Sequence, residues 1–360
     1  MLQAIDTERN PNGYRHFFHG ASKAFIAPDG KPFTASEALA AADLDFHVSK
    51  TQLGAYTPRV DSAPKFTKAQ GFYVTSRDDS GDILGKVGKN FNVFQNIEAV
   101  NLASDIIDSG EANIKVMGSV KGGAETFMTL LLPGTQLKVA GLEDETVQLY
   151  LTLMNSHTGG QSVTGFIGAE RVPCANMLQY DFKNAKAKFR VRHTATMRDK
   201  LNAMTGREML GITIAYMAEW ETQMTRLLED QYSDRRVDDF LKRLLPLPEE
   251  EVVTKTYTDK DSGELVTVPM QNRGVTVALE TREAIRDIYD TADNLNNIRG
   301  TGYGVLNAVN EYVQHHVEGR ITKGRKGGEE RILAENRFKR ILSDQSLDDK
   351  ALPMLLSVAR

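Results

Sequence analysis

The sequence has one cysteine, Cys174, in 360 residues, which excludes an internal disulfide framework. A single thiol also excludes a zinc site made of several thiolates. No apolar run approaches the roughly 20 residues that span a bilayer, and residues 1–30 hold no apolar run of signal-peptide length. We therefore expect a cytoplasmic protein that does not associate with membranes.

Common nucleotide- and metal-binding motifs are missing as well. The glycine pairs of "VKGGAE" (120–125) and "SHTGGQ" (156–161) lack the lysine and the glycine spacing of a P-loop or a dinucleotide-binding loop. The acidic segment "DDSGD" (78–82) lacks the spaced ligands and terminal glutamate of a calcium loop, so a turn is the simpler interpretation. We expect no metal and no cofactor.

Charge is present but unevenly distributed. The formal net charge is −4, which argues against a wholly basic nucleic-acid-binding protein. Residues 183–207, in contrast, carry eight lysines and arginines and one acid, Asp199. Segregated charge of this kind gives an acidic protein a local basic surface.

The centre of this basic segment, "KAKFRVRH" (186–193), alternates cations with other residues. In a β-strand the cations point to one face at intervals of roughly 6.5–7 Å, which is comparable to the phosphate repeat of an extended nucleic-acid strand. The residues concerned are Lys186, Lys188, Arg190 and Arg192, flanked by Arg198 and Lys200. An edge strand that uses cations to prevent aggregation shows the same alternation, so both interpretations stay open.

A second basic segment occupies residues 319–340. A solvated helix preceded by a loop explains most of its charge, and a loop that closes over a polyanion is the alternative. The candidate residues of that loop are Arg320, Lys323, Arg325 and Lys326.

The stretch "NSHTGGQSVTGFIGAERVPCANML" (155–178) contains both Cys174 and His157. A nucleophilic cysteine needs a base or a positive environment that lowers its thiol pKa, and His157 is a candidate for that base. The competing interpretation is a scaffold, with a strand end, a glycine turn and a helix start around a buried thiol. We favour the scaffold, because one cysteine and one unplaced histidine are a weak signal for catalysis.

The order of local patterns predicts an α+β fold. Strand patterns on both sides of "DDSGD", followed by a helical pattern from Asn96, indicate an N-terminal antiparallel sheet with a ββα-type core and packed helices. The second half is predicted to be mostly helical, with an inserted β-hairpin near 251–269. We expect an α+β core domain at 1–195 and a mainly helical region at 196–360.

Four stretches together resemble the phage-and-plasmid family known as domain of unknown function 932. They are "KAFIAPDGKPFTASEALAAADLDFHVSK" (23–50), "LGKVGKNFNVFQNIEAV" (84–100), "YLTLMNSHTGGQSVTGFIGAERVPCANML" (150–178) and "RGTGYGVLNAVNEYVQHH" (299–316). The resemblance implies a mobile-element setting, near recombination and repair genes, and no established activity. With the ββα-type core, this setting suggests by distant analogy the annealing proteins of the Redβ, RecT and Erf kind, which hold single strands in a basic groove without ATP.

Our leading hypothesis is a phage- or plasmid-encoded protein that binds and anneals single-stranded DNA in recombination. It would act as a homo-oligomer, without enzymatic activity and without ATP. The alternating cations of residues 186–192, called the basic strand below, would hold the DNA backbone. Tyr73, Phe91 and Phe94 are candidates for base stacking. Two alternatives remain open: a hydrolytic enzyme that uses Cys174 and His157, and a phage module that binds a host protein.

Overall fold

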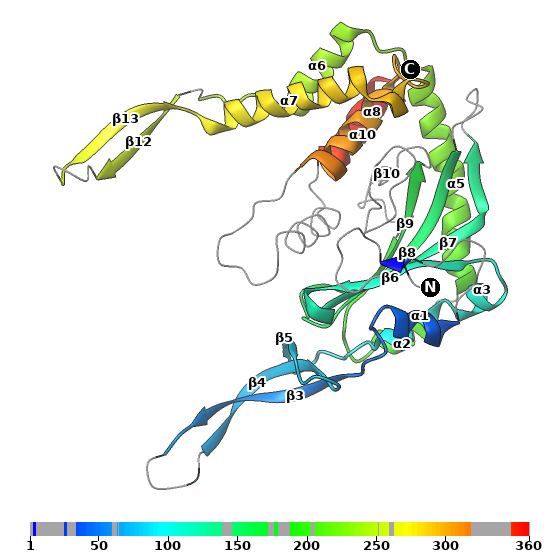
Figure 1. Cartoon of the computed structure of the whole chain (residues 1–360), viewed down its shortest axis with the longest axis vertical. Helices are drawn as coiled ribbons and strands as arrows, with labels where there is room; N and C mark the ends of the chain where they lie inside the picture. Colours follow the sequence, from blue (N-terminus) through cyan, green and yellow to red (C-terminus); the bar gives the residue numbers. More distant parts are fainter. Residues whose placement is uncertain are drawn as a thin grey trace. The chain divides into compact units, whose positions relative to one another are not determined.

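The computed structural model describes residues 3–4, 25–26, 34–59, 63, 65–138, 146–171, 176–178, 188–202, 206–250, 252–258, 263–317 and 347–359. Contacts divide the chain into two compact units, residues 1–222 with 318–344 and residues 223–317 with 345–360. Antiparallel sheets occupy the N-terminal half and helices dominate the C-terminal half, so the α+β class is confirmed (Figure 1). The division into a core domain at 1–195 and a mainly helical region at 196–360 stays a prediction.

The first unit is built on a large antiparallel sheet. In pairing order its strands are β1 (Gln3–Ala4), β2 (Phe25–Ile26), β6 (Asn113–Val120), β7 (Glu125–Lys138), β8 (Thr146–Ser156), β9 (Val163–Arg171) and β10 (Asn176–Leu178), and β11 (Lys188–Val191) also pairs with β9. Leu130 pairs with Leu151 and Thr129 with Thr152, and all four are buried. Because neighbouring residues of a strand face opposite sides, both faces of the central strands are covered.

A second sheet is formed by β3 (Val48–Thr57), β4 (Lys65–Arg77) and β5 (Ile83–Gly88). The segment "DDSGD" makes the turn between β4 and β5, as predicted, and Gly81 supplies its left-handed conformation with φ of 74°. β5 pairs only with Phe72–Ser76 of β4. The remaining length of β3 and β4 therefore continues as a two-stranded ribbon (Figure 1).

Helices accompany these sheets in the first unit. They are α1 (Ala35–Ala41), α2 (Asn96–Leu102), α3 (Ser104–Asp108), α4 (Met197–Asn202) and α5 (Gly206–Glu229), the last reaching into the second unit, and β6 is joined to β7 by the 3₁₀ turn η2 (Lys121–Gly123). Met197 and Leu201 of α4 are buried with Val191, Val163 and Phe94. This cluster holds the end of β11 against β9, because burial of apolar side chains favours their association.

The second unit is mainly helical. Its elements are α6 (Asp234–Leu244), β12 (Val252–Thr258), β13 (Leu265–Gln271), α7 (Arg273–Thr291), the 3₁₀ turn η3 (Asp293–Leu295), α8 (Gly302–Glu311), the π-helical turn η4 (Tyr312–His316) and α10 (Leu347–Val358). Phe240, Tyr303 and Leu355 form part of its core, and β12 and β13 form the inserted hairpin. Among the described helices, none combines the length and the apolar character that crossing a bilayer requires.

The helix expected directly after Cys174 is absent. Residues Asn176–Leu178 form β10 and pair with Ala169–Arg171 of β9 in antiparallel register. Their backbone groups therefore bond to a neighbouring strand instead of to each other. A three-residue segment carries too weak a local preference to oppose such pairing.

Candidate nucleic-acid interface

Three segments that are far apart in the sequence line an open groove of about 510 Å³ in the first unit. They are residues 88–91 after β5, residues 159–162 between β8 and β9, and residues 192–194 after β11. The lining residues include two cations, Lys89 and Arg192, and no aspartate or glutamate. Both cationic side chains are exposed, so the groove offers positive charge to a ligand.

The first segment is held in place by Lys50 of β3. Its ammonium donates hydrogen bonds to the carbonyl oxygens of Lys89, at 2.6 Å, and Phe91, at 2.8 Å. The same ammonium lies 4.6 Å from the centre of the Tyr73 ring, a cation–π distance. Burial lowers the pKa of Lys50. Lys50 therefore serves as a support of the loop, whereas the side chain of Lys89 is exposed.

The second segment is the glycine pair identified in the sequence. Gly159 has φ of 74°, and a Cβ built on it would lie 3.2 Å from Cγ1 of Val87. Glycine thus permits both the turn and the close approach to β5. The amide of Gly160 donates to the Thr158 hydroxyl at 3.2 Å, and Thr75 donates to the carbonyl of His157 at 2.6 Å. The first bond shapes the loop itself, and the second attaches it to β4 of the β3–β4–β5 sheet.

The third segment ends the basic strand. Phe189 packs over Gly165 of β9 and Val191 is buried, while Arg190 and Arg192 are exposed. The alternation predicted for this strand therefore holds at these positions. Within the described residues β11 pairs with β9 alone, so its cations also suit the role of protecting a sheet edge. Lys188 is a strand position of β11, and Lys186 lies outside the described residues.

His193 lines the groove without adding charge. Its Nδ1–H donates to the carbonyl of Asn92 at 3.0 Å, and its buried Nε2 has no hydrogen-bond partner. Burial lowers the pKa of His193, the largest of the effects on this group. The imidazole is therefore neutral at pH 7, and the positive charge of the groove comes from Lys89 and Arg192.

The two flanking cations differ in their surroundings. Arg198 Nε donates to Oε1 of Glu98 at 2.7 Å, and one of its terminal nitrogens donates to the carbonyl of Val93 at 2.8 Å. The pair with Glu98 raises the pKa of Arg198 and compensates its charge. Lys200 is exposed on α4. The other predicted cations, Arg320, Lys323, Arg325 and Lys326, lie outside the described residues.

His157 is fully buried. Its Nε2 lies 3.1 Å from Oδ1 of Asn96, and its backbone amide donates to Ala124 at 2.8 Å. Burial, aided by the nearby His193, lowers the pKa of His157 to about 3. A neutral, enclosed imidazole favours the scaffold interpretation. Cys174 lies outside the described residues.

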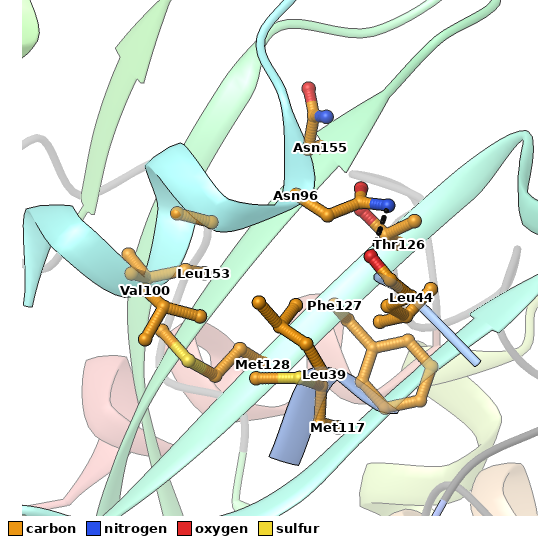
Figure 2. A pocket seen from close by; sticks show the side chains of 11 residues that line it. Leu39, Leu44, Asn96, Val100, Met117, Thr126, Phe127, Met128, Leu153 and Asn155 are labelled. Atoms are coloured by element: carbon orange, nitrogen blue, oxygen red, sulfur yellow. Dashed lines mark hydrogen bonds between the residues drawn. The ribbon is translucent and has the colours of Figure 1, made fainter. Parts of the chain in front are cut away.

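A small cavity lies beside Asn96 and Asn155 (Figure 2). Its volume is about 10 Å³, which is the space of a single water molecule. Asn96 donates to the carbonyl of Leu44 at 3.0 Å along one side of the cavity, and apolar side chains such as Met117 and Phe127 close the rest (Figure 2). The cavity is too small for a ligand. Across the described part of the chain, no three His, Cys, Asp or Glu side chains are arranged to hold a metal ion.

The aromatic residues proposed for base stacking are placed differently from one another. Phe94 is 3% exposed and belongs to the core, so that expectation is wrong. Phe91 and Tyr73 are half-buried. Sequence reasoning also missed Lys89 and two exposed aromatic residues, Tyr56 and Phe66. Their proximity to an arginine in "YTPR" and to lysines in "KFTK" was an available signal.

The family described as "Domain of unknown function (DUF932)" matches residues 83–337, which include all three segments of the groove. The β3–β4 hairpin precedes the matched range. No curated protein and no solved structure matches the chain.

Proposed function

The chain belongs to the family of domain of unknown function 932, and we propose that it binds single-stranded DNA in the groove between residues 88–91, 159–162 and 192–194. The observation that carries the proposal is a groove with two exposed cations and no carboxylate, on a chain whose net charge is negative. Phosphate groups are the ligands that such a surface attracts.

Several features of the groove suit an extended strand. Arg190 and Arg192 are exposed two residues apart, so their side chains follow one another along one face at roughly 6.5–7 Å. Gly159 and Gly160 allow a backbone to approach closely, because they carry no side chain. The exposed amides of Asn90 and Gln161 supply donors and acceptors for bases or phosphates.

Strand annealing without ATP is the role that we propose for this binding, in a phage or plasmid context and in a homo-oligomer. Two groove cations per chain give modest affinity for a polyanion. Repetition of the groove in an oligomer raises the effective concentration of the second and later contacts. Neutralisation of phosphates by lysine and arginine forms and breaks no covalent bond.

The test is fluorescence anisotropy of a labelled oligo(dT) over a range of salt concentrations. We compare the wild type with Lys89→Glu/Arg192→Glu, and with a control that has the same charge change on α6, Arg235→Glu/Lys242→Glu. If the two groove cations, Arg190 and Lys188 each contact one phosphate, the logarithm of the wild-type binding constant should fall with the logarithm of the salt concentration with a slope of about −3. The groove variant should bind about tenfold or more weakly than the wild type. Its slope should be shallower by about 1.4, since each of the two lost phosphate contacts contributes about 0.7.

The proposal fails if the wild type shows no salt-sensitive binding at micromolar protein. It also fails if the α6 control loses as much affinity as the groove variant. Cys174→Ala separates the proposal from a thiol-dependent enzyme: we expect unchanged oligonucleotide binding and an unchanged circular dichroism spectrum. Light scattering after size-exclusion chromatography measures the oligomer directly.

A further inference from the structure

The ribbon formed by β3 and β4 beyond β5 carries an exposed aromatic pair. Tyr56 and Phe66 are directly opposite each other in the antiparallel register, and they are 67% and 52% exposed. Cross-strand aromatic pairs usually pack on a sheet face that another layer covers. Here two large rings face solvent on a ribbon of two strands, an element that has little stability in isolation.

The position of the Phe66 ring is defined by a glycine. A Cβ built on Gly54 would lie 2.3 Å from Cζ of Phe66, so the ring occupies the space that any other residue at position 54 would fill. Lys68 is paired with Gly54 in the register and therefore lies on the same face as Phe66. The face thus presents two flat rings and a lysine together.

The charge of the ribbon has one sign throughout its described part. Arg59, Lys65 and Lys68 are exposed, and the described residues of 48–77 include no aspartate or glutamate. The one acid in that range of the sequence, Asp61, lies outside the described residues. Nearer the groove, Lys86 Nζ lies 4.8 Å from the centre of the Phe72 ring, which is 48% exposed. Aromatic rings interleaved with cations are the combination that binds unpaired nucleobases and their phosphates.

We propose that this ribbon is a second nucleic-acid contact, in which Tyr56 and Phe66 stack on unpaired bases while Lys68, on the same face, contacts an adjacent phosphate. The inference rests on the proposed function of the groove and adds a second contact to the same strand, because stacking requires bases that are not paired. Charge complementarity selects this occupant over a second copy of the ribbon, since two ribbons of the same charge repel each other.

The two contacts differ in chemistry, so one experiment separates them. The probes are a labelled oligo(dT) and a labelled oligonucleotide of the same length made of abasic sites. The variant is Tyr56→Ala/Phe66→Ala, and the matched control is Tyr257→Ala/Leu265→Ala, which removes exposed side chains from the β12–β13 hairpin (46% and 75% exposed). Tyr56→Phe keeps a ring at the site and should retain binding.

We expect the wild type to bind oligo(dT) at least about thirtyfold more tightly than the abasic strand, as two stacked bases predict. Tyr56→Ala/Phe66→Ala should bind both probes equally, with the salt slope and the thermal midpoint unchanged, and the β12–β13 control should behave as wild type. If the wild type binds neither probe in a salt-sensitive manner, the proposed function itself fails.

Salt-sensitive binding with equal affinity for both probes overturns the ribbon inference alone, and so does an aromatic double variant that binds as wild type. A lower mass of Tyr56→Ala/Phe66→Ala in light scattering, with the preference for bases unchanged, would identify the ribbon as a subunit contact and overturn it as well.

Discussion

Phe91 stacks on the ring of His193, with ring centres 4.6 Å apart and planes inclined by 26°. Two hydrogen bonds lie beside the stack, since the Asn92 amide donates to the His193 carbonyl and His193 Nδ1 donates to the Asn92 carbonyl, each at 3.0 Å. The loop after β5 is thereby attached to the end of β11. This attachment brings Lys89 and Arg192, which neighbour the stacked residues, to the same groove.

Removal of the Phe91 ring tests this attachment. Phe91→Ala should lower the free energy of unfolding by about 1–3 kcal/mol, because a half-buried ring and its stacking contact are lost. It should also weaken oligo(dT) binding several-fold while leaving the salt slope unchanged, since no cation is removed. Phe91→Tyr keeps the ring and should match the wild type in urea unfolding and in anisotropy. Equal behaviour of Phe91→Ala and Phe91→Tyr would contradict a positioning role.

Acidification should destabilise the fold through its buried histidines. The pKa of His157 is lowered to about 3 by burial, and the pKa of His193 is lowered for the same reason. Below the ordinary histidine pKa of 6.5 the unfolded chain binds protons that the folded chain does not, so stability falls as the pH decreases toward 3. Urea unfolding between pH 7.5 and 5 should show this slope.

His157→Gln isolates the contribution of that residue. Well below pH 6.5 one buried neutral histidine contributes about 1.4 kcal/mol per pH unit to the slope of the unfolding free energy. The unfolding free energy of the variant should therefore fall less steeply between pH 7.5 and pH 5. At pH 7.5 the variant should be less stable than the wild type, because the buried bond to Asn96 is lost. A slope equal to that of the wild type would show that His157 is protonated in the folded chain.

A glycine of β9 controls the position of the basic strand. A Cβ on Gly165 would lie 2.1 Å from Cε1 of Phe189, so alanine must displace Phe189 and β11 with it. We expect Gly165→Ala to cost roughly 1–3 kcal/mol of stability and to weaken oligo(dT) binding. Gly211→Ala, where nothing lies within 4 Å of the new Cβ inside α5, should instead stabilise by about 0.5–1 kcal/mol. Unchanged stability and binding in Gly165→Ala would refute the packing argument.

Local patterns in the chain predicted several elements correctly. The turn at "DDSGD", the hairpin that includes β12 and β13, and the outward direction of Arg190 and Arg192 follow from turn composition and from a period of two. These features depend on residues close together in the sequence. The same patterns misjudged Phe94, which is buried, and residues 176–178, which form a strand, because both outcomes depend on a partner elsewhere in the chain.

Composition and spacing were sufficient for the α+β class and for a concentration of cations near residue 190. The family resemblance rested on four stretches of sequence. The groove required the three-dimensional arrangement, because its three segments meet through Lys50, through the left-handed Gly159 and through the stack of Phe91 on His193. Each of these contacts joins parts of the chain that no local pattern connects. The burial that makes His157 a neutral support has the same origin, since desolvation depends on every segment packed around a side chain.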